Sequence, residues 1–340
     1  MTNGKYKISI ALCTYNGAKF IIRQLESFSA QTRLPDELVI CDDCSSDATV
    51  EIIRDFISNA PFPVWLQVNQ TNLGSTKNFE KAISSCAGEL IYLSDQDDLW
   101  LPDKIARIEA EFEKNPKVGM VFSDAEIVDE NLQPLGRTLW SFTFSDEKRE
   151  VARAGKFFDV LLAQNVVTGA TMAFRAEFRK TFTPIPEGIP NLIHDGWISL
   201  VIAGEAEVVF IDEPLVKYRQ HAAQQLGIGY EATLAVDFNE RRNRYGASIA
   251  FSENEVARLK QMEEIFAVYP QFARKRGGTI EFANLIEEKR AKIAHYEARR
   301  RLPLTRFGRL LPVLREVSSG RYRRFSKGWL SAAKDLLEKW

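Results

Sequence analysis

A close cluster of three carboxylates follows an apolar run in the first third of the chain. Residues 90–98 read LIYLSDQDD, so that Asp95, Asp97 and Asp98 lie within four positions. Carboxylates this close raise one another's pKa, and a cluster without a partner is costly. A divalent cation removes that cost, and oxygen ligands suit Mg²⁺ or Mn²⁺, which also bind substrate phosphates. The cluster therefore predicts a metal and diphosphate site. Capping of the next helix is the alternative, but it does not explain Asp95 as well.

Short apolar runs and helical patterns alternate around this cluster. The runs lie at Lys7–Cys13, Leu38–Cys41, Val64–Val68 and Leu90–Leu93, and the helical patterns at about 18–30, 47–58, 75–85 and 102–114. This alternation predicts an α/β fold with a mostly parallel sheet flanked by helices. Ligands of such sheets bind beyond the carboxyl ends of the strands. Thr14, Asp43 and Asn69 each follow a run, so we expect them to gather near Asp95.

The second half of the chain has a less regular pattern. It predicts strands at Val118–Phe122, Val166–Phe174 and Glu207–Ile211 and a helix over Asp195–Ala203, and it turns helical beyond Gly229. Ser252 followed by Glu255 is a capping-box signal, which predicts the start of a helix. We therefore expect a ligand-binding domain over residues 1–228 and a helical C-terminal region over residues 229–340.

Charge is unevenly distributed along the chain, although the net charge is -1. Residues 1–288 carry 30 Lys and Arg against 42 Asp and Glu, whereas residues 289–340 carry 15 against 4. The acidic body argues against nucleic-acid binding, which requires a basic surface. The basic tail also contains Phe307, Leu311 and Trp329. Such a mixture predicts contact with an anionic membrane surface, and packing of the tail on the acidic body is the alternative.

Cysteine content and hydropathy indicate a compartment. Four cysteines are too few to staple 340 residues, which predicts a reducing environment. No run approaches the roughly 18 to 20 apolar residues needed to cross a bilayer, and the first run breaks too early for a secretory signal. We expect a cytoplasmic protein that is peripheral on the inner face of the cytoplasmic membrane.

Four segments in order carry a resemblance to a known family. They are Thr14-Tyr15-Asn16-Gly17, the stretch Cys41–Asp47 with the sequence CDDCSSD, the triplet Asp95-Gln96-Asp97, and His194-Asp195. Over about residues 7–225 the chain resembles family 2 glycosyltransferases with the GT-A nucleotide-sugar-binding fold. The combination of LSDQDD, HDGW and YRQH is most similar to the rhamnosyltransferase-like branch.

The resemblance implies roles for the residues that bind the donor. Thr14, the backbone around Tyr15, and Asn16 would hold the nucleotide, and Asp43 would accept a hydrogen bond from the base. A carboxylate can pair with the imide N–H of uracil or thymine, whereas N3 of cytosine is only an acceptor. UDP- or dTDP-sugars are therefore the expected donors. Lys77 matches the family pattern and could approach the donor, although a solvated lysine is the alternative.

The resemblance also implies a metal site and a base. Asp97 and Asp95 would hold Mn²⁺ or Mg²⁺ on the donor diphosphate. His221, in the sequence YRQH, is either a further metal ligand or a structural residue. Asp195 would be the catalytic base that deprotonates the acceptor hydroxyl, with inversion at the anomeric carbon, and helix capping is its alternative role. We predict no role for His295.

The expected function is transfer of a sugar, with rhamnose as the first candidate, to a hydroxyl of a cell-surface glycan or lipid-linked acceptor. A sugar-1-phosphate nucleotidyltransferase is one alternative, but it would need a Gly-rich loop after the first strand, and TYNGAKF has none. A non-catalytic nucleotide-sugar-binding scaffold is the other alternative. Asp97 and Asp195 argue against it.

Overall fold

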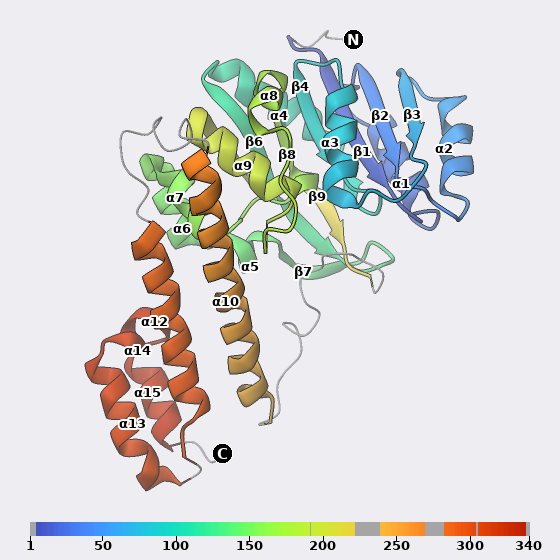
Figure 1. Ribbon diagram of the computed structural model, residues 1–340. Coiled ribbons are helices and arrows are strands. Elements are labelled where there is room, and N and C mark those ends of the chain that lie inside the picture. The colour runs from blue at the N-terminus through green and yellow to red at the C-terminus, as the bar shows by residue number, and fades with distance from the viewer. Residues whose placement is uncertain (1–4, 191, 222–238, 269–281, 304, 338–340) are drawn as a thin grey trace. The chain divides into compact units, whose positions relative to one another are not determined.

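A computed structural model describes residues 5–190, 192–221, 239–268, 282–303 and 305–337 (Figure 1). The described residues fall into an N-terminal and a C-terminal unit that divide near residue 228. Within these residues, no helix combines the length and apolar content required to cross a membrane.

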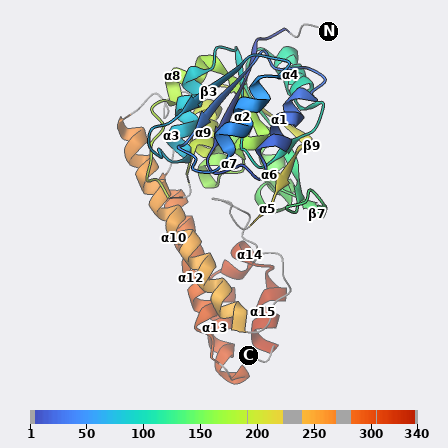
Figure 2. The same cartoon turned by 90° about the vertical axis from the view of Figure 1, so that its right-hand side faces the viewer.

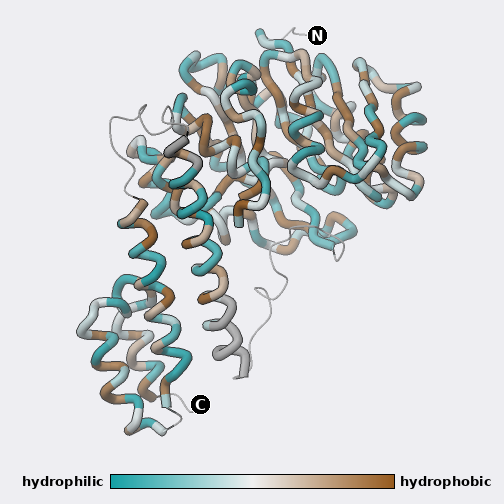
Figure 3. Tube along the Cα trace, viewed as in Figure 1, coloured by the Kyte–Doolittle hydropathy of each residue, from teal (hydrophilic) through white to brown (hydrophobic). Residues whose placement is uncertain are grey.

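The first four large strands of the N-terminal unit form a parallel sheet. They are β1 (Ile8–Thr14), β2 (Glu37–Asp42), β3 (Val64–Val68) and β4 (Leu90–Ser94), in the order β3-β2-β1-β4. Thr14 pairs with Asp42, and Asp42 pairs with Val68, so these strands end at one edge of the sheet. All seven residues of β1 are buried, as expected for a strand covered on both faces. Figure 3 shows the hydrophobic character of these strands.

The rest of the sheet mixes parallel and antiparallel pairs. Its strands are β5 (Leu99–Trp100), β6 (Val118–Val128), β7 (Pro134–Thr138), β8 (Met172–Arg175) and β9 (Glu207–Arg219). β8 lies antiparallel between β4 and β6, and β6 runs parallel to β9. Both β6 and β9 extend beyond their predicted ends, through a register shift beside Pro214. The predicted α/β class, with a sheet flanked by helices, is confirmed.

The prediction of a strand over Val166–Phe174 is wrong in its first half. Only β8, from Met172, joins the sheet, and residues Gly169–Thr171 form a 3₁₀ turn. The backbone N–H of Gly169 donates to Asp195, and that of Thr171 donates to the carbonyl of Thr168. These backbone groups are therefore not available to a neighbouring strand.

Helices cover both faces of the sheet. The longer ones are α1 (Ile21–Ser29), α2 (Thr49–Ile57), α3 (Ser75–Ser85), α4 (Lys104–Lys114) and α9 (His194–Glu205). Figure 2 shows α3 and α9 on one face and α1 and α4 on the other. Short elements complete the unit: α5 (Trp140–Thr143), α6 (Asp146–Val151), a π-helical turn (Ala152–Lys156), α7 (Phe157–Ala163), a 3₁₀ turn (Ala176–Phe178) and α8 (Arg179–Phe182).

The C-terminal unit is helical in its described residues. It comprises α10 (Asn239–Val268), α12 (Phe282–Arg300), α13 (Arg306–Ser318), α14 (Arg321–Phe325) and α15 (Trp329–Leu337). The predicted helix start at Ser252 is wrong, because α10 already begins at Asn239. Ser252 donates its hydroxyl back to the carbonyl of Ser248, and Glu255 pairs with Arg258 instead of forming a capping box.

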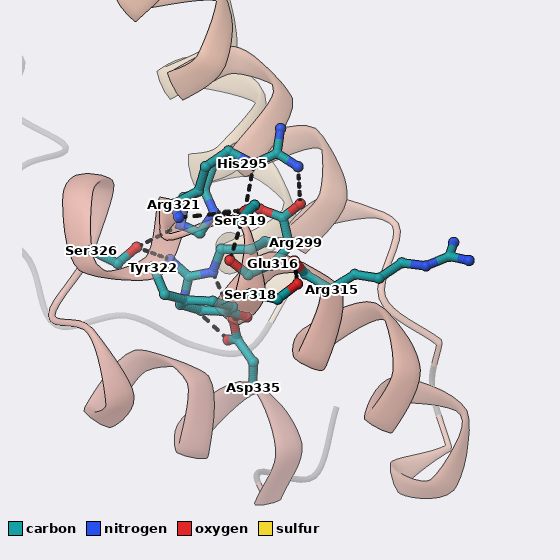
Figure 4. A network of polar contacts seen from close by, with 10 residues as sticks. All are labelled: His295, Arg299, Arg315, Glu316, Ser318, Ser319, Arg321, Tyr322, Ser326 and Asp335. Carbon is teal, nitrogen blue, oxygen red and sulfur yellow. Dashed lines mark hydrogen bonds and ion pairs between the residues drawn. The ribbon is translucent and has the colours of Figure 1, made fainter.

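A buried polar network joins the last four helices (Figure 4). His295 is fully buried; its Nδ1 lies 2.9 Å from Glu316 Oε2, and its Nε2 lies 2.8 Å from the Ser326 hydroxyl. Arg299 and Asp335 form a second pair, with Nε and Oδ2 2.6 Å apart. The expectation that His295 has no role is therefore wrong, because this side chain connects α12 to α13 and to the residue after α14.

Candidate active site

The loops after β1 and β2 are connected through Asp42. The Thr14 hydroxyl donates to Asp42 Oδ2 at 2.8 Å, and the Ser45 backbone N–H donates to Asp42 Oδ1 at 2.9 Å. Both Thr14 and Asp42 are buried. Asp42 therefore acts within the protein as the residue that orders these two loops, consistent with a turn-forming aspartate.

Gln96 connects the loop after β1 to the loop after β4. Its Oε1 accepts from the Tyr15 N–H at 2.9 Å, and its Nε2 donates to the Tyr15 carbonyl at 3.0 Å. The Tyr15 side chain remains about half exposed. Asn16 adopts a left-handed conformation with φ of 47°, and its Oδ1 accepts from the Ser46 N–H. Tyr15 and Asn16, two of the predicted nucleotide-binding residues, are thus held from both sides.

Asp43 is buried at the end of β2 and already accepts three hydrogen bonds. Its Oδ1 accepts from Asn69 Nδ2 and from the Leu73 N–H, and its Oδ2 accepts from the Gly74 N–H, all within 2.7–2.8 Å. An ionised carboxylate has about four acceptor positions. Asp43 therefore keeps one acceptor position on Oδ2 for a further N–H donor.

Lys77 lies in the first turn of α3. Its Nζ donates to Glu80 Oε2 at 2.9 Å and to the Ile185 carbonyl at 2.8 Å. Glu80 lies on α3 itself, and the contact with Ile185 anchors α3 to the segment after α8. The structure therefore gives Lys77 a packing role, and its predicted approach to the donor stays a prediction.

Asp97 and His221 meet beside β9. Asp97 Oδ2 lies 2.7 Å from His221 Nε2, and the imidazole packs on Phe20 with ring centroids 4.5 Å apart. Arg219 supports the same corner: its Nε donates to the Asp97 carbonyl, and its guanidinium lies 4.8 Å from the Phe20 ring centroid. Two residues that are 124 positions apart in the sequence thus form one pair.

Asp95 and Asp98 flank this pair in a low-dielectric environment. Burial, and then the charges of Asp97 and Asp195, raise the pKa of Asp95 to about 7. Asp98 is fully buried; its Oδ1 accepts from the Arg219 N–H, while its Oδ2 has no hydrogen-bond partner among the described residues. Burial also raises the pKa of Asp98 well above its ordinary value. The cluster is therefore short of positive charge.

Lys104 supplies one cation to this cluster from the first turn of α4. Its ammonium is fully buried, donates to the Ala170 carbonyl at 2.6 Å and lies 3.4 Å from the centroid of the Trp100 ring. Burial holds the pKa of Lys104 well below its ordinary value, against the opposing effect of Asp98 and Asp95. The Arg219 guanidinium also acts on Asp97 and Asp98, so two cations face the three carboxylates of Asp95, Asp97 and Asp98.

The donor atoms present fit a divalent cation with a partly open coordination shell. No group of three or more His, Cys, Asp or Glu side chains in metal-binding geometry occurs among the described residues. Asp97 and His221 do supply a carboxylate oxygen and an imidazole nitrogen 2.7 Å apart. Neighbouring ligands of an octahedral ion at 2.0–2.1 Å are about 3 Å apart, so a small movement would admit an ion, with substrate oxygens completing its shell.

Asp195 lies in the first turn of α9 and is nearly buried. Its Oδ2 accepts from the Gly169 N–H at 3.0 Å, and its Oδ1 accepts from Asn165 Nδ2 at 3.3 Å and from the Gly196 N–H at 2.5 Å. Burial raises the pKa of Asp195 to about 6, although these hydrogen bonds lower it. The carboxylate is therefore mostly ionised at pH 7 and remains basic enough to accept a proton.

The neighbours of Asp195 in the HDGW motif have structural roles. His194 stacks on Phe79 with ring centroids 4.0 Å apart, and burial lowers its pKa to about 3, so the imidazole is neutral. Trp197 is buried and donates its indole N–H to the Phe182 carbonyl at 2.8 Å. Both rings fix the start of α9, which positions the Asp195 carboxylate.

From the sequence we assigned no role to three residues of this site, which are Lys104, Asn165 and Gly169. Lys104 follows Asp103 in a helical pattern typical of a surface helix, and neither Asn165 nor Gly169 belongs to a recognisable motif. Their roles depend on the close approach of α9, β4 and the 3₁₀ turn before β8. Gln96 is a fourth such residue, and its place between Asp95 and Asp97 is the signal that the sequence offers for it.

Comparison with known proteins identifies the family. Residues 9–179, about half of the chain, match the profile of glycosyl transferase family 2. The chain therefore belongs to this family of glycosyltransferases.

Relatives agree with this assignment. An uncharacterized protein of Mycobacterium tuberculosis is 27% identical over 217 residues, which cover 63% of this chain and 59% of the relative. An uncharacterized glycosyltransferase of Nostoc sp. is 28% identical over 64% of this chain and 66% of the relative. The aligned part thus spans about three fifths to two thirds of these relatives.

Two solved structures share the fold. Staphylococcus aureus TarS residues 1–349, in complex with UDP-GlcNAc, has a TM-score of 0.51 at 16% identity and covers 94% of this chain and 89% of that one. The mannosyltransferase PcManGT from Pyrobaculum calidifontis, in complex with GDP-Man and Mn²⁺, has a TM-score of 0.54 at 16% identity, with coverage of 100% and 89%. The N-terminal unit therefore has the predicted GT-A fold.

Proposed function

We propose that this glycosyltransferase inverts the anomeric carbon of a UDP- or dTDP-sugar and transfers the sugar to a hydroxyl of a cell-surface glycan or lipid-linked saccharide. The rhamnosyltransferase-like motifs make dTDP-rhamnose the first donor to test. One observation supports the catalytic part of the proposal: two adjacent residues of the 3₁₀ turn before β8 contact both parts of the candidate site. Gly169 donates its backbone N–H to Asp195 at 3.0 Å, and the Ala170 carbonyl accepts from Lys104 at 2.6 Å. Lys104 interacts electrostatically with Asp98 and Asp95, so we infer that the candidate metal ligands and the candidate base act on one substrate.

Donor binding is assigned to the loops after β1 and β2. Thr14, Tyr15 and Asn16 form the loop that Asp42 and Gln96 fix in place. The remaining acceptor position of Asp43 suits the imide N–H of uracil or thymine. The bound donors of TarS and PcManGT are UDP-GlcNAc and GDP-Man, so a guanine nucleotide belongs in the test as a competitor.

Asp97 and His221, with Asp95 beside them, would hold Mn²⁺ or Mg²⁺ on the donor diphosphate. When bound, the cation neutralises the negative charge of the departing nucleoside diphosphate. Mn²⁺ is bound in PcManGT, and the imidazole nitrogen of His221 is a ligand that Mg²⁺ rarely uses. Arg219 and Phe20 would keep both donor atoms directed at the ion.

Asp195 would take the proton of the acceptor hydroxyl as that oxygen attacks the anomeric carbon. Hydrogen bonds from Gly169 and Asn165 restrict rotation of the carboxylate, which favours one attack geometry. Its position in the first turn of α9 also allows stabilisation by the helix dipole. Capping and catalysis are therefore compatible roles for this side chain.

We also propose a reducing, cytoplasmic environment for this enzyme. All four cysteines are free thiols, three of them buried. Burial raises the pKa of Cys41 to about 11, which suppresses its reactive thiolate form. Neither Cys41 nor Cys44 is expected to act in redox chemistry or metal binding.

A thermal-shift panel tests the donor assignment. UDP-, dTDP- and GDP-sugars are compared with and without Mn²⁺, because a ligand at 100 times its Kd stabilises the folded protein by about 2.7 kcal/mol. We expect the largest shift from a uridine or thymidine sugar in the presence of Mn²⁺. A shift restricted to GDP-sugars would contradict the assignment of Asp43. In a separate assay, release of nucleoside diphosphate when an acceptor is added would identify the reaction as sugar transfer.

A further inference from the structure

The apolar face of α13 is directed outward. Phe307 is 95% exposed and Leu311 is 73% exposed. They belong to a stripe spaced at i, i+3, i+4 and i+7, which consists of Phe307, Leu310, Leu311 and Leu314. The buried residues of the helix are Val313, which belongs to a small apolar cluster with Leu302, Tyr322 and Ala332, and the charged residues Arg309 and Glu316. A surface helix of a globular protein normally turns its main apolar stripe to the core, whereas α13 exposes most of its large apolar side chains.

α15 also exposes large apolar side chains. Trp329, Leu330 and Leu337 are between 65% and 74% exposed, whereas Ala332 and Asp335 are buried and Leu336 packs on the apolar cluster. α15 packs against α13. Figure 3 shows the hydrophobic residues of these two helices beside hydrophilic ones. We call the exposed residues of α13, α14 and α15 the α13–α15 surface.

The polar network fixes this orientation (Figure 4). Glu316 contacts His295, and Arg309 donates to the carbonyls of Pro303 and Asp335 at 2.6 and 3.2 Å. Rolling α13 to bury its apolar stripe would break these contacts and leave charged groups without partners. Loss of a buried partner is strongly unfavourable, so the exposure of the stripe is a stable property of the fold.

The charge of the α13–α15 surface has one sign. From Arg306 to Leu337 the chain has only two carboxylates, Glu316 and Asp335, and both are buried and paired. The exposed cations of this region are Arg306, Arg315, Arg323, Arg324, Lys327 and Lys334. Arg324 is paired with Glu288 of α12 at 3.6 Å. The α13–α15 surface therefore combines large apolar side chains with positive charge, and its own two carboxylates are buried.

We propose that the α13–α15 surface docks on an anionic lipid bilayer, with its aromatic and leucine side chains at the headgroup boundary and its cations on lipid phosphates. Amphipathic helices with Trp, Phe and Leu beside Lys and Arg bind membranes in this way. A second copy of the same surface is a poor partner, because like charges would face each other. This proposal concerns a different surface from the active site and does not depend on the proposed reaction.

Vesicle flotation of the full chain tests the proposal. Phosphatidylcholine vesicles are compared with vesicles that also contain phosphatidylglycerol. We expect the protein to float with the anionic vesicles, and to be released by added salt, which screens the attraction. Equal flotation on both vesicle types, or no flotation on the anionic vesicles, would overturn the proposal.

Paired variants locate the contact. The double substitution Phe307→Ser and Leu311→Ser should weaken vesicle binding by about tenfold or more, because it removes two insertable side chains. The matched control is Trp65→Ser, which removes a 59% exposed tryptophan from β3 and should leave binding unchanged. Unaltered melting temperatures verify that the variants are folded, as expected for exposed positions.

Charge is tested separately. Replacing Arg315 and Lys334 with glutamine should weaken binding to anionic vesicles by roughly 30-fold, since each cation near a headgroup contributes about 1 kcal/mol. Lys114→Gln with Lys117→Gln, at exposed positions of the N-terminal unit, is the control. Analytical ultracentrifugation tests whether a second copy of the chain binds the α13–α15 surface instead. If the apolar variants lose self-association, and neither the unaltered protein nor any variant binds vesicles, the lipid proposal is wrong.

Discussion

Buried charges in the C-terminal helices are paired with protein groups, whereas those at the carboxyl edge of the sheet are only partly paired. Asp335 contacts Arg299 at 2.6 Å and the Tyr322 hydroxyl at 2.6 Å. Asp98 is equally buried but has one oxygen without a partner among the described residues, and Asp95 has a pKa of about 7. A network with its partners in place stabilises a structure, while an incomplete one marks a place where a ligand can supply the missing charge.

The largest effect is expected from Asp195→Asn, which removes the proposed base. Transfer should fall by about 10² to 10⁴-fold, the range for general base catalysis, while donor binding changes little. The measurement is kcat for sugar transfer together with donor affinity by calorimetry. Near-normal turnover would refute the catalytic role of Asp195 and leave helix capping as its function.

A large loss of stability is expected from Asp335→Ala in the paired network. Removing one partner of a buried ion pair costs about 3–5 kcal/mol, so denaturant unfolding should show a weakened C-terminal unit. Glu111→Ala is the control, because it breaks the more exposed Lys114 pair and should cost no more than about 1 kcal/mol. If both variants lose the same free energy of unfolding, the buried pair of Asp335 is no more stabilising than the surface pair of Glu111.

An intermediate effect is expected from His221→Ala at the proposed metal corner. The apparent affinity for Mn²⁺ should fall by about tenfold or more, since perturbing a metal site typically costs 10–100-fold. Activity is titrated with Mn²⁺ at saturating donor. Asp103→Asn, at a half-exposed carboxylate of the same segment, should keep the wild-type titration, and an unchanged titration for His221→Ala would make that histidine structural.

Within the range from pH 6 to pH 8, the smallest effect is expected from pH. The pKa of Asp195 is raised to about 6 by burial, and the base must be deprotonated to act. The value of kcat/KM should therefore rise with pH, about tenfold per unit well below pH 6, and level off above it. The measurement is kcat/KM in buffers from pH 4.5 to pH 8. If kcat/KM stays constant through pH 6, Asp195 is not the base of the rate-limiting proton transfer.

The alternation of apolar runs and helical patterns predicted the N-terminal sheet, because β1, β2 and β4 are buried on both faces and therefore read as continuous apolar runs. It failed at Val166–Phe174, where an apolar sequence gives its backbone hydrogen bonds to a turn and to Asp195. Periodicity describes burial, and it does not specify the partner of a backbone N–H group.

The candidate site was predictable where residues stand together in the sequence and unpredictable where the fold joins them. Asp95 and Asp97 are two positions apart, and the His221 contact with Asp97 was expected only through the resemblance. Lys104 could not be predicted, because a lysine at the start of an amphipathic helix is normally solvated. The network around His295 was missed for a different reason. Its partners lie on three different elements, and the sequence does not show which elements the fold brings together.

The two hydrogen bonds between Gln96 and the Tyr15 backbone restrict which residue can occupy position 17. A Cβ atom on Gly17 would lie 2.0 Å from Gln96 Oε1, so any side chain at this position would displace the amide. This displacement would break the two hydrogen bonds between Gln96 and the Tyr15 backbone. Glycine at position 17 thus lets Gln96 join the loop after β1 to the loop after β4.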